Sequence, residues 1–211
     1  MKTLLIAALA AIFSLISFQV TAQTSSAQPL EDSATEEHLF IDVHQLEPGK
    51  VTFEAVKEAH AKDLQVQGKH HVSFRKFWVD ESDGLGYCLS SARNAESVRE
   101  THAEAHGLLP AQIYQVSDGA AATFKRKKRL YLDVHYFGPG NVSAKDVEAA
   151  HAKDLAVQKK HHVKFINYWV DEEKGVVMCL SESKNSKCVI ETHKEAHGLL
   201  PAKVMRVKEG K

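Results

Sequence analysis

The sequence has no excess of charge of either sign, which excludes one broad class of partner. Its 211 residues include 27 lysines and arginines and 27 aspartates and glutamates, so the formal net charge at neutral pH is zero. Because binding to nucleic-acid phosphates draws on an excess of basic residues, we expect no nucleic acid as the main partner. The hydrophobic share of 44% is ordinary for a globular protein and excludes wholesale disorder.

Cysteine is scarce, and several motifs of enzyme chemistry are absent from the sequence. There is no CxxC pair, no nucleophile elbow and no phosphate-binding glycine loop. The spacing of Cys88, Cys179 and Cys188 requires no disulfide, so we expect free buried thiols, with a soft metal ligand as the alternative. Histidine, by contrast, occurs 13 times, and a functional interpretation starts there.

The first 22 residues have the pattern of a secretory signal peptide. Lys2 precedes an apolar run from Leu4 to Val20, and small residues lead to an expected cleavage after Ala22. The run is short for a membrane span and lacks a basic flank, so an uncleaved anchor is the weaker alternative. No later stretch is long enough to span a membrane. We therefore expect a soluble periplasmic or secreted protein with a flexible polar leader over residues 23–37.

The rest of the chain consists of two copies of one unit. Shifted by 91 positions, the sequence aligns with itself without a gap, so that LFIDVH at 39–44 matches LYLDVH at 130–135. This self-similarity predicts two domains, residues 38–117 and 129–208. The segment between them, 118–128, contains a basic run, which we interpret as a solvated linker in preference to a patch for an anionic surface.

The histidines follow this duplication almost without exception. Only His38 has no mate, and positions between the copies have diverged, as at Gln65 and Ala156. Retention of every histidine pair exceeds the general identity of the two copies. The pairs are His44/His135, His60/His151, His70/His161, His71/His162, His102/His193 and His106/His197.

Each copy is predicted to fold as strand, helix, strand, strand, helix, strand. This βαββαβ order is typical of the ferredoxin-like α+β fold, and right-handed crossovers place both helices on one face of the sheet. The other face must be covered, so we expect the two tandem domains to pack against each other as an internal pseudo-dimer of the dimeric α/β-barrel type, in a monomeric chain. The elements expected in the first copy are strands over 39–44, 72–80, 85–90 and 113–116, and helices from Thr52 to about Lys69 and from Asn94 to Gly107.

The alternation of side chains along the strands also predicts which face each one occupies. The apolar odd-numbered positions from Leu39 to Val43 are expected to meet the helices. The polar residues between them would point away, toward the other copy, where they need partners because burying unpaired polar groups is costly. These residues are Asp42, His44 and Cys88 in the first copy and Asp133, His135 and Cys179 in the second.

Two histidines four residues apart on the second predicted helix are candidate metal ligands. His102 and His106 project from one helix face, a spacing that lets two imidazoles bind one metal ion. A solvated or core-edge pair is the competing interpretation. The topology places His44 at the same edge of the domain as His106. His193 and His197 repeat the pair in the second copy.

A carboxylate and a histidine share a face of the first predicted helix. His60 and Asp63 lie three residues apart, and a buried histidine held by a carboxylate is an equally good interpretation of this pair. His60 and His102 lie nearer the middle of their helices and could form a second cluster or belong to packing. His70 and His71 are interpreted as mainly surface residues. His151 and Asp154 are the second-copy equivalents of the helical pair.

The pattern DVH…AHAKDLxVQ…YWVDE…CL…ETHxEAHGLLPA resembles a bacterial family of unknown function linked to a nickel-binding, nickel-responsive protein. The resemblance covers both copies and implies a ferredoxin-like fold that pairs as a dimeric barrel and binds a divalent metal, with nickel as the ion. This sequence departs from the family in its His-His pair at 70–71, its signal peptide and its two fused domains. The family-type residues are His44, His60, Asp63, Gln67, Trp78, Asp80, Cys88, His102 and His106, and their mates 91 positions later.

The residues and the resemblance together predict an exported divalent-metal-binding protein. Nickel is favoured, with Cu²⁺ and Zn²⁺ as other ions that prefer imidazole. The alternatives are a dimeric-barrel enzyme or a small-molecule- or haem-binding module with a pocket between the two sheets, and a structural module whose histidines only pack. We assign no catalytic residue. The expected metal ligands are His44, His60, Asp63, His102, His106, His135, His151, Asp154, His193 and His197, with Asp42, Cys88, Asp133 and Cys179 as further possibilities.

Overall fold

The computed structural model describes residues 36–119 and 129–211. The expected signal peptide, most of the leader and most of the linker therefore lie outside the described residues. In the described part of the chain, no helix is both long and apolar enough to cross a membrane.

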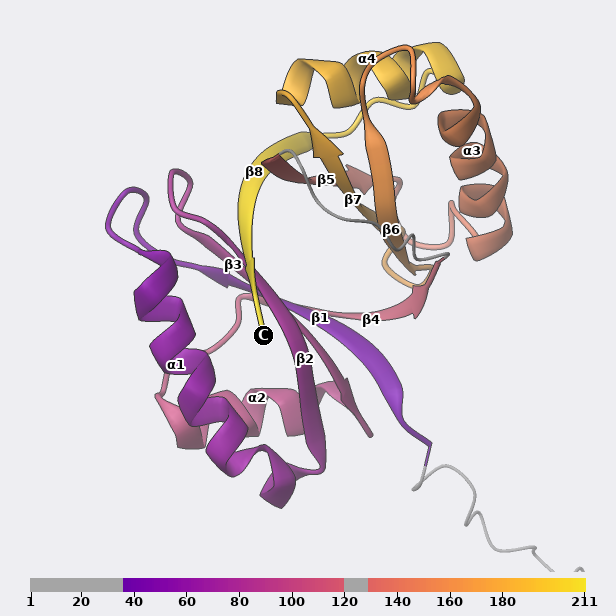
Figure 1. The fold of residues 1–211 in the computed structure, drawn as a ribbon. Helices are drawn as coiled ribbons and strands as arrows, with labels where there is room; N and C mark the ends of the chain where they lie inside the picture. Colours follow the sequence, from indigo (N-terminus) through magenta and orange to yellow (C-terminus); the bar gives the residue numbers. More distant parts are fainter. Residues whose placement is uncertain (1–35, 120–128) are drawn as a thin grey trace, which may run out of the picture. The chain divides into compact units, whose positions relative to one another are not determined.

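The two repeats have the predicted order of elements, drawn in Figure 1. The first repeat contains β1 (His38–Gln45), α1 (Phe53–Val66), a short 3₁₀ helix (Gln67–His70), β2 (Val72–Asp80), β3 (Leu85–Ala92), α2 (Ala95–Ala105) and β4 (Gln112–Asp118). The second contains β5 (Arg129–Tyr136), α3 (Ala144–Val157), β6 (Lys164–Asp171), β7 (Val176–Ser183), α4 (Ser186–Ala196) and β8 (Lys203–Gly210). The predicted α+β class with two tandem domains is confirmed.

Local sequence signals explain where the helices begin and end. The side chain of Thr52 accepts a hydrogen bond from the Ala55 amide at the start of α1, and Asn94 accepts one from Ser97 at the start of α2. Both are favoured N-cap residues, because they satisfy amides that have no partner within the helix. Helix α2 ends just before Gly107, whose φ of +76° is a left-handed conformation that glycine adopts at low cost.

The eight strands form one closed barrel, in the order β1-β3-β2-β8-β5-β7-β6-β4. The last strand of each repeat closes it. Strand β8 pairs with β5 of its own repeat and then reaches β2, where Val79 faces Lys208 (Figure 1). Strand β4 pairs with β1 and reaches β6, where Ser117 faces Val170. The expected internal pseudo-dimer is therefore built with backbone pairing between the repeats as well as side-chain packing.

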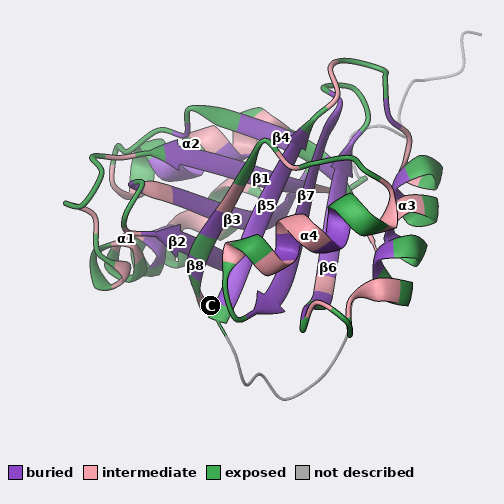
Figure 2. Cartoon of the chain, turned by 90° about the horizontal axis from the view of Figure 1, so that it is seen from above, coloured by how far each residue is buried: buried purple, intermediate pink, exposed green. Residues whose placement is uncertain are grey.

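An apolar cluster drawn from the strands of both repeats fills the barrel. It includes Ile41 and Leu89 of the first repeat and Leu132 and Leu180 of the second. The rings of Trp78 and Trp169 meet in the same cluster, with centroids 5.2 Å apart. Figure 2 shows the strands buried along most of their length. The two repeats therefore share one core and are expected to unfold together.

The predicted assignment of strand faces is wrong, and the structure inverts it. Ile41 and Val43 point into the barrel, whereas Asp42, His44 and Cys88 lie on the outer face, beneath the helices. The physical reason lies in the helices, since the side chains that α1 buries are His60 and Asp63. The polar strand residues find partners beneath the helices, since Asp42 contacts His102 of α2, and Phe40 and Phe77 of the same face pack there in a separate apolar cluster. The wholly apolar face packs against the other repeat. The pocket between the sheets that the enzyme alternative required is thus not lined by these polar residues.

Truncating one side chain of the shared interior should destabilise both repeats at once. We expect Ile41→Ala, or its equivalent Leu132→Ala, to lower the free energy of unfolding by about 2–5 kcal/mol, because each leaves a cavity in a core that cannot fully collapse. Urea unfolding followed by tryptophan fluorescence and far-ultraviolet circular dichroism measures this. The two probes should give one coincident transition.

Leu109→Ala, at a side chain that is 51% exposed, is the control and should change stability by less than about 0.5 kcal/mol. Separate transitions, with one of them unshifted, would contradict a shared core.

Candidate metal centre

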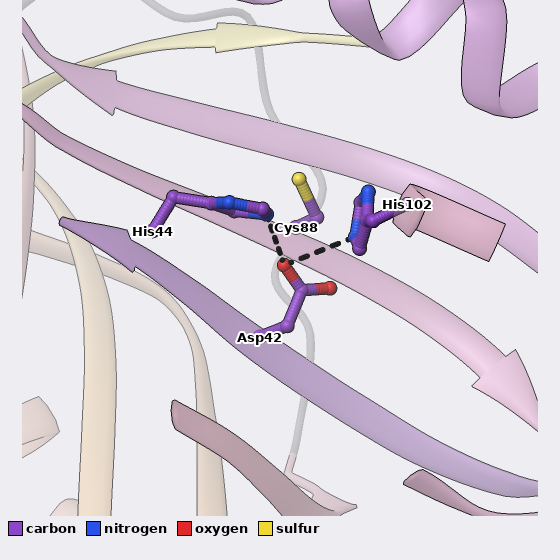
Figure 3. A group of neighbouring side chains, drawn as sticks. All are labelled: Asp42, His44, Cys88 and His102. Carbon is purple, nitrogen blue, oxygen red and sulfur yellow. Dashed lines mark ion pairs between the residues drawn. The ribbon is translucent and has the colours of Figure 1, made fainter. Parts of the chain in front are cut away.

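In each repeat, two strands and two helices bring a compact cluster of polar side chains together. Asp42 and His44 come from β1, and Cys88 stands opposite Asp42 in the register of β1 and β3. His102 comes from the last turn of α2. Figure 3 shows the carboxylate of Asp42 directed toward the space between the two imidazoles, with the thiol of Cys88 beside them. We call Asp42, His44, Cys88 and His102 the inner cluster.

The donor atoms of the inner cluster are spaced as ligands of one ion would be. His44 Nε2 lies 3.0 Å from Asp42 Oδ1, and His102 Nε2 lies 3.4 Å from the same oxygen. All four donor atoms, including the sulfur of Cys88, lie within 4.8 Å of one another. An ion held at about 2.0–2.2 Å by nitrogen and oxygen places neighbouring ligand atoms about 2.9–3.6 Å apart. Both nitrogen–oxygen distances to Asp42 Oδ1 fall in this range.

The inner cluster also leaves buried polar atoms unsatisfied. Asp42 is 0% exposed and His102 is 1% exposed. Both carboxylate oxygens of Asp42 and Nε2 of His102 lack a well-aligned hydrogen bond to any residue that the structure describes. A buried carboxylate without such partners is costly, and a cation among these atoms removes that cost. The donor set and its unsatisfied atoms therefore fit a divalent metal ion.

A second triangle of atoms lies on the other side of the same imidazole. His102 Nδ1 is 3.0 Å from Asp63 Oδ1, and His106 Nε2 is 3.2 Å from that oxygen. The two ring nitrogens are 3.3 Å apart. We call Asp63, His102 and His106 the outer cluster. His102 thus belongs to both clusters and presents one ring nitrogen to each.

Hydrogen bonding distinguishes the two clusters as metal sites. The Leu108 amide donates to His106 Nδ1 over 3.1 Å, so a neutral His106 carries its proton on Nε2, the atom that faces Asp63. That nitrogen donates to the carboxylate and offers no lone pair to a metal. The equivalent Leu199 amide donates to His197 in the second repeat. The inner cluster is therefore the better metal site, and Asp63 takes the position of a carboxylate that orients a ligating histidine from behind.

The charges around His102 bear on its proton. Burial by itself lowers the pKa of this imidazole, but its contacts with the carboxylates of Asp42 and Asp63 outweigh burial and raise the pKa to about 9. The same contacts lower the pKa of both aspartates, although burial opposes the change. Near neutral pH, His102 is thus an imidazolium between two carboxylates when no metal is bound. A metal ion must displace that proton.

The cysteine of the cluster is held as a thiol. Burial, together with the charges of Asp42 and Asp63, raises the pKa of Cys88 well above its usual value, and Cys179 behaves in the same way beside Asp133 and Asp154. Both cysteines are buried and free of disulfides, while Cys188 is free and partly buried. That the first two are buried and form no disulfide agrees with the sequence.

The second repeat reproduces the arrangement with one difference. His135 Nε2 lies 3.2 Å and His193 Nε2 lies 3.4 Å from Asp133 Oδ1. His193 Nδ1 lies 3.1 Å from Asp154 Oδ1. The contacts with Asp133 and Asp154 raise the pKa of His193 to about 10 despite its burial. Cys179, unlike Cys88, is outside the set of atoms that lie within 4.8 Å of one another.

Several residues that the sequence predicts at the site lie outside both clusters and have structural roles. His60, 3% exposed, packs its ring against Phe74 and Phe77, and His151 packs in the same way on Phe165 and Tyr168. The side chain of Gln67 accepts a hydrogen bond from the Phe74 amide, Trp78 donates to Glu209, and Asp80 accepts from Ser82 in the turn after β2.

The expected grouping of histidines changes as well. The ring of His44 contacts that of His102, with centroids 4.7 Å apart, and is 6.4 Å from that of His106. His102 is therefore the centre of one continuous network and does not pair with His60 in a separate cluster. His70 stays outside the network, where it lies 2.9 Å from a carboxylate oxygen of Glu104. No pattern in the sequence indicates that one imidazole serves two clusters, because this depends on how α1 and α2 pack side by side on the sheet.

The fold and these clusters define a protein whose two domains together form, within one chain, a barrel of the dimeric α/β-barrel type. Each domain contains a candidate divalent-metal centre. Residues 40–116 and 131–207 each match the family model described as "Nickel responsive protein SCO4226-like". The chain belongs to this family.

Comparison with solved structures gives further likenesses. SCO4226 from Streptomyces coelicolor A3(2) is 31% identical over 36% of this chain and 93% of that chain, with a TM-score of 0.35. Chlorite dismutase from Candidatus Nitrospira defluvii, in complex with imidazole, is 8% identical over 82% of this chain and 90% of that chain, with a TM-score of 0.46. No curated protein matches the chain.

The metal-free protein should lose stability as the pH rises above neutrality. The pKa of His102 is raised to about 9 and that of His193 to about 10, so the stability they contribute is fully present below about pH 6.5 and is lost as the pH rises through 9 to 10. The raised pKa values correspond to at most about 3 kcal/mol for His102 and about 5 kcal/mol for His193. Acid destabilises the protein through the aspartates. Because the pKa values of Asp42 and Asp63 are lowered, the stability that these carboxylates contribute is lost as the pH falls below about 4.

Urea unfolding between pH 6 and pH 9.5, in the presence of a chelator, measures the alkaline loss. The control is the double variant His102→Gln with His193→Gln, which should be less stable at pH 6 and should have a much flatter pH dependence. An unchanged slope in that variant would show that other groups cause the loss.

Proposed function

We propose that this protein is an exported divalent-metal-binding protein, with nickel as the favoured ion and one binding centre in each repeat. The observation that carries the proposal is the inner cluster, in which imidazole nitrogens and an unsatisfied buried carboxylate lie at ligand spacing, and which recurs around Asp133 in the second repeat. Retention of this arrangement in both copies, although other positions have diverged, supports a function for it.

Each residue of the first centre has a separate task in this proposal. Asp42, His44 and His102 provide oxygen and nitrogen donors, and Cys88 provides a sulfur that is available once its proton leaves. Asp63 accepts the Nδ1 proton of His102 and so keeps Nε2 directed at the ion. His106 donates to Asp63 and holds that carboxylate in place. A bound divalent ion supplies positive charge that offsets the two buried carboxylates.

The choice of nickel rests on the chemistry of the donors and on the family. Sets of imidazole and carboxylate donors suit nickel, copper and zinc alike, so the residues alone do not separate these ions. The family to which the chain belongs is described as nickel responsive, which favours nickel for this chain.

Removing the central histidine of a repeat should remove one bound ion. We expect the untagged chain from Gln23 onward to bind two nickel ions, His102→Ala or His193→Ala to bind one, and the double variant to bind none, with affinity at the lost centre reduced more than about 100-fold. Titration calorimetry and metal analysis of dialysed protein measure this. Near neutral pH, each ion should release the proton that His102 or His193 carries.

Two matched variants make this test specific. His70→Ala with His161→Ala removes histidines that contact Glu104 and Glu195 on the surface and should leave both ions bound. His106→Gln keeps a donor toward Asp63 and should also retain the first ion. Retention of two ions by the His102→Ala, His193→Ala double variant would place nickel elsewhere. Loss of the first ion in His106→Gln would shift the site to the outer cluster.

Export is the second part of the proposal and rests on the N-terminal sequence. We expect the full-length chain, expressed in a Gram-negative bacterium, to accumulate in the periplasm with Gln23 as its first residue, as measured by fractionation and mass spectrometry. Leu9→Arg places a charge in the apolar run and should leave the chain uncleaved inside the cell. Wild-type protein that keeps Met1 in the cytoplasmic fraction would contradict export.

A further inference from the structure

Each repeat contains a cavity between its helices and the outer face of its sheet. The cavity of the first repeat has a volume of about 300 Å³ and that of the second about 270 Å³. Apolar side chains form most of the wall of the first cavity, among them Val51, Val56, Ala59 and Leu108. The metal-binding function proposed above does not use the apolar part of this space.

The apolar wall persists in the second repeat although the two sequences have diverged. Val142, Val147, Ala150 and Leu199 occupy the positions equivalent to those four residues. Next to them, Leu46 of the first cavity is replaced by Phe137 in the second. Retention of both cavities, with apolar walls, indicates a space that accommodates a ligand, since a packing defect would be closed by larger side chains at little cost.

The polar end of the cavity is the metal centre. His44, Cys88 and His102 line the cavity, whereas Asp42 lies behind them and is fully buried. An ion held by the inner cluster would thus have Asp42 on one side and the cavity on the other. Metal sites that keep a position open toward a pocket bind small molecules there, in contrast to closed structural sites.

We propose that each cavity binds a small monocarboxylic acid with an apolar body, whose carboxylate reaches the metal ion of that repeat. The proposal rests on the metal binding proposed above. The hydrocarbon body of the ligand would cover the apolar wall of the cavity, which removes that surface from contact with water. A volume of about 300 Å³ holds roughly ten non-hydrogen atoms at the 30 Å³ that one water occupies in the liquid.

The charges of the centre make this binding depend on the metal. Without an ion, the polar end of the cavity lies beside the buried carboxylates of Asp42 and Asp63, which disfavour a further carboxylate there. With a divalent ion in place, the carboxylate of the ligand meets a cation at the end of the cavity. A neutral molecule of the same shape lacks this attraction and should bind weakly in both states.

Fluorine NMR with para-fluorobenzoate as the probe tests the proposal on the mature chain. Nickel content is measured first in the same sample. We expect the nickel-loaded protein to shift and broaden the fluorine resonance saturably, with at least tenfold tighter binding than that of metal-free protein. Para-fluorotoluene, which lacks the carboxylate, should show at least tenfold weaker binding.

Variants that fill one cavity locate the probe. Ala59→Phe should remove one of two probe sites and Ala150→Phe the other, with both nickel ions retained; Ala59→Leu and Ala150→Leu serve if the larger side chain prevents folding. Ala61→Leu, on the exposed side of α1, is the matched control and should keep both sites.

The possible results separate this inference from the proposed function. Protein that binds no nickel would overturn both. Protein that carries two nickel ions but does not bind para-fluorobenzoate, or binds it as well without metal, would overturn the cavity proposal alone. Probe binding that survives in the double cavity-filling variant would overturn it too, because the acid would then bind elsewhere.

Discussion

The structure of each repeat depends on one buried imidazole held between two carboxylates. His102 lies within 3.4 Å of Asp42 through one ring nitrogen and within 3.0 Å of Asp63 through the other. Neither aspartate could be buried at such low exposure without this positive charge or a metal ion in its place. The contact also fixes the packing of the elements, because it ties the end of α2 to both β1 and α1. A site that holds a proton or a cation with the same atoms couples the stability of the domain to its chemistry.

The two faces of the sheet separate packing from chemistry. The inner face is apolar and is shared with the other repeat, whereas the apolar residues of the outer face form a separate cluster beneath the helices of each repeat. Each repeat has an outer face of its own, which carries its histidines, its aspartates and its cavity. Closure of the barrel by β4 and β8 joins the strands of the two repeats in one closed sheet. The centres of the two repeats nevertheless remain chemically independent, since each is built from residues of its own repeat.

Much of the candidate site could be predicted from sequence, but its connectivity could not. The spacing of His102 and His106 correctly placed both on one helix face, and duplication identified their mates. The same reasoning included His60, which packs against aromatic rings, and paired His44 with His106, although its closer neighbour is His102. Spacing within a helix says which residues share a face, yet the partner of that face is decided by how α1 and α2 pack on the sheet. The role of His106 as a donor to Asp63 follows from a backbone amide at Leu108 that no motif reveals.

The sequence by itself determined the duplication, the order of strands and helices, the caps at Thr52 and Asn94, and the set of residues from which the centres are built. Each of these depends on local spacing or on comparison of the chain with itself. Tertiary structure alone decided which strand face the helices cover, and here the prediction from alternation was inverted. Alternation separates two faces but does not orient them, because orientation depends on whether α1 and α2 or the second repeat offers the more apolar surface. The face that carries Asp42 and His44 lies beneath the helices because Asp63 and His102 on those helices provide its polar partners, and the wholly apolar face is turned toward the other repeat.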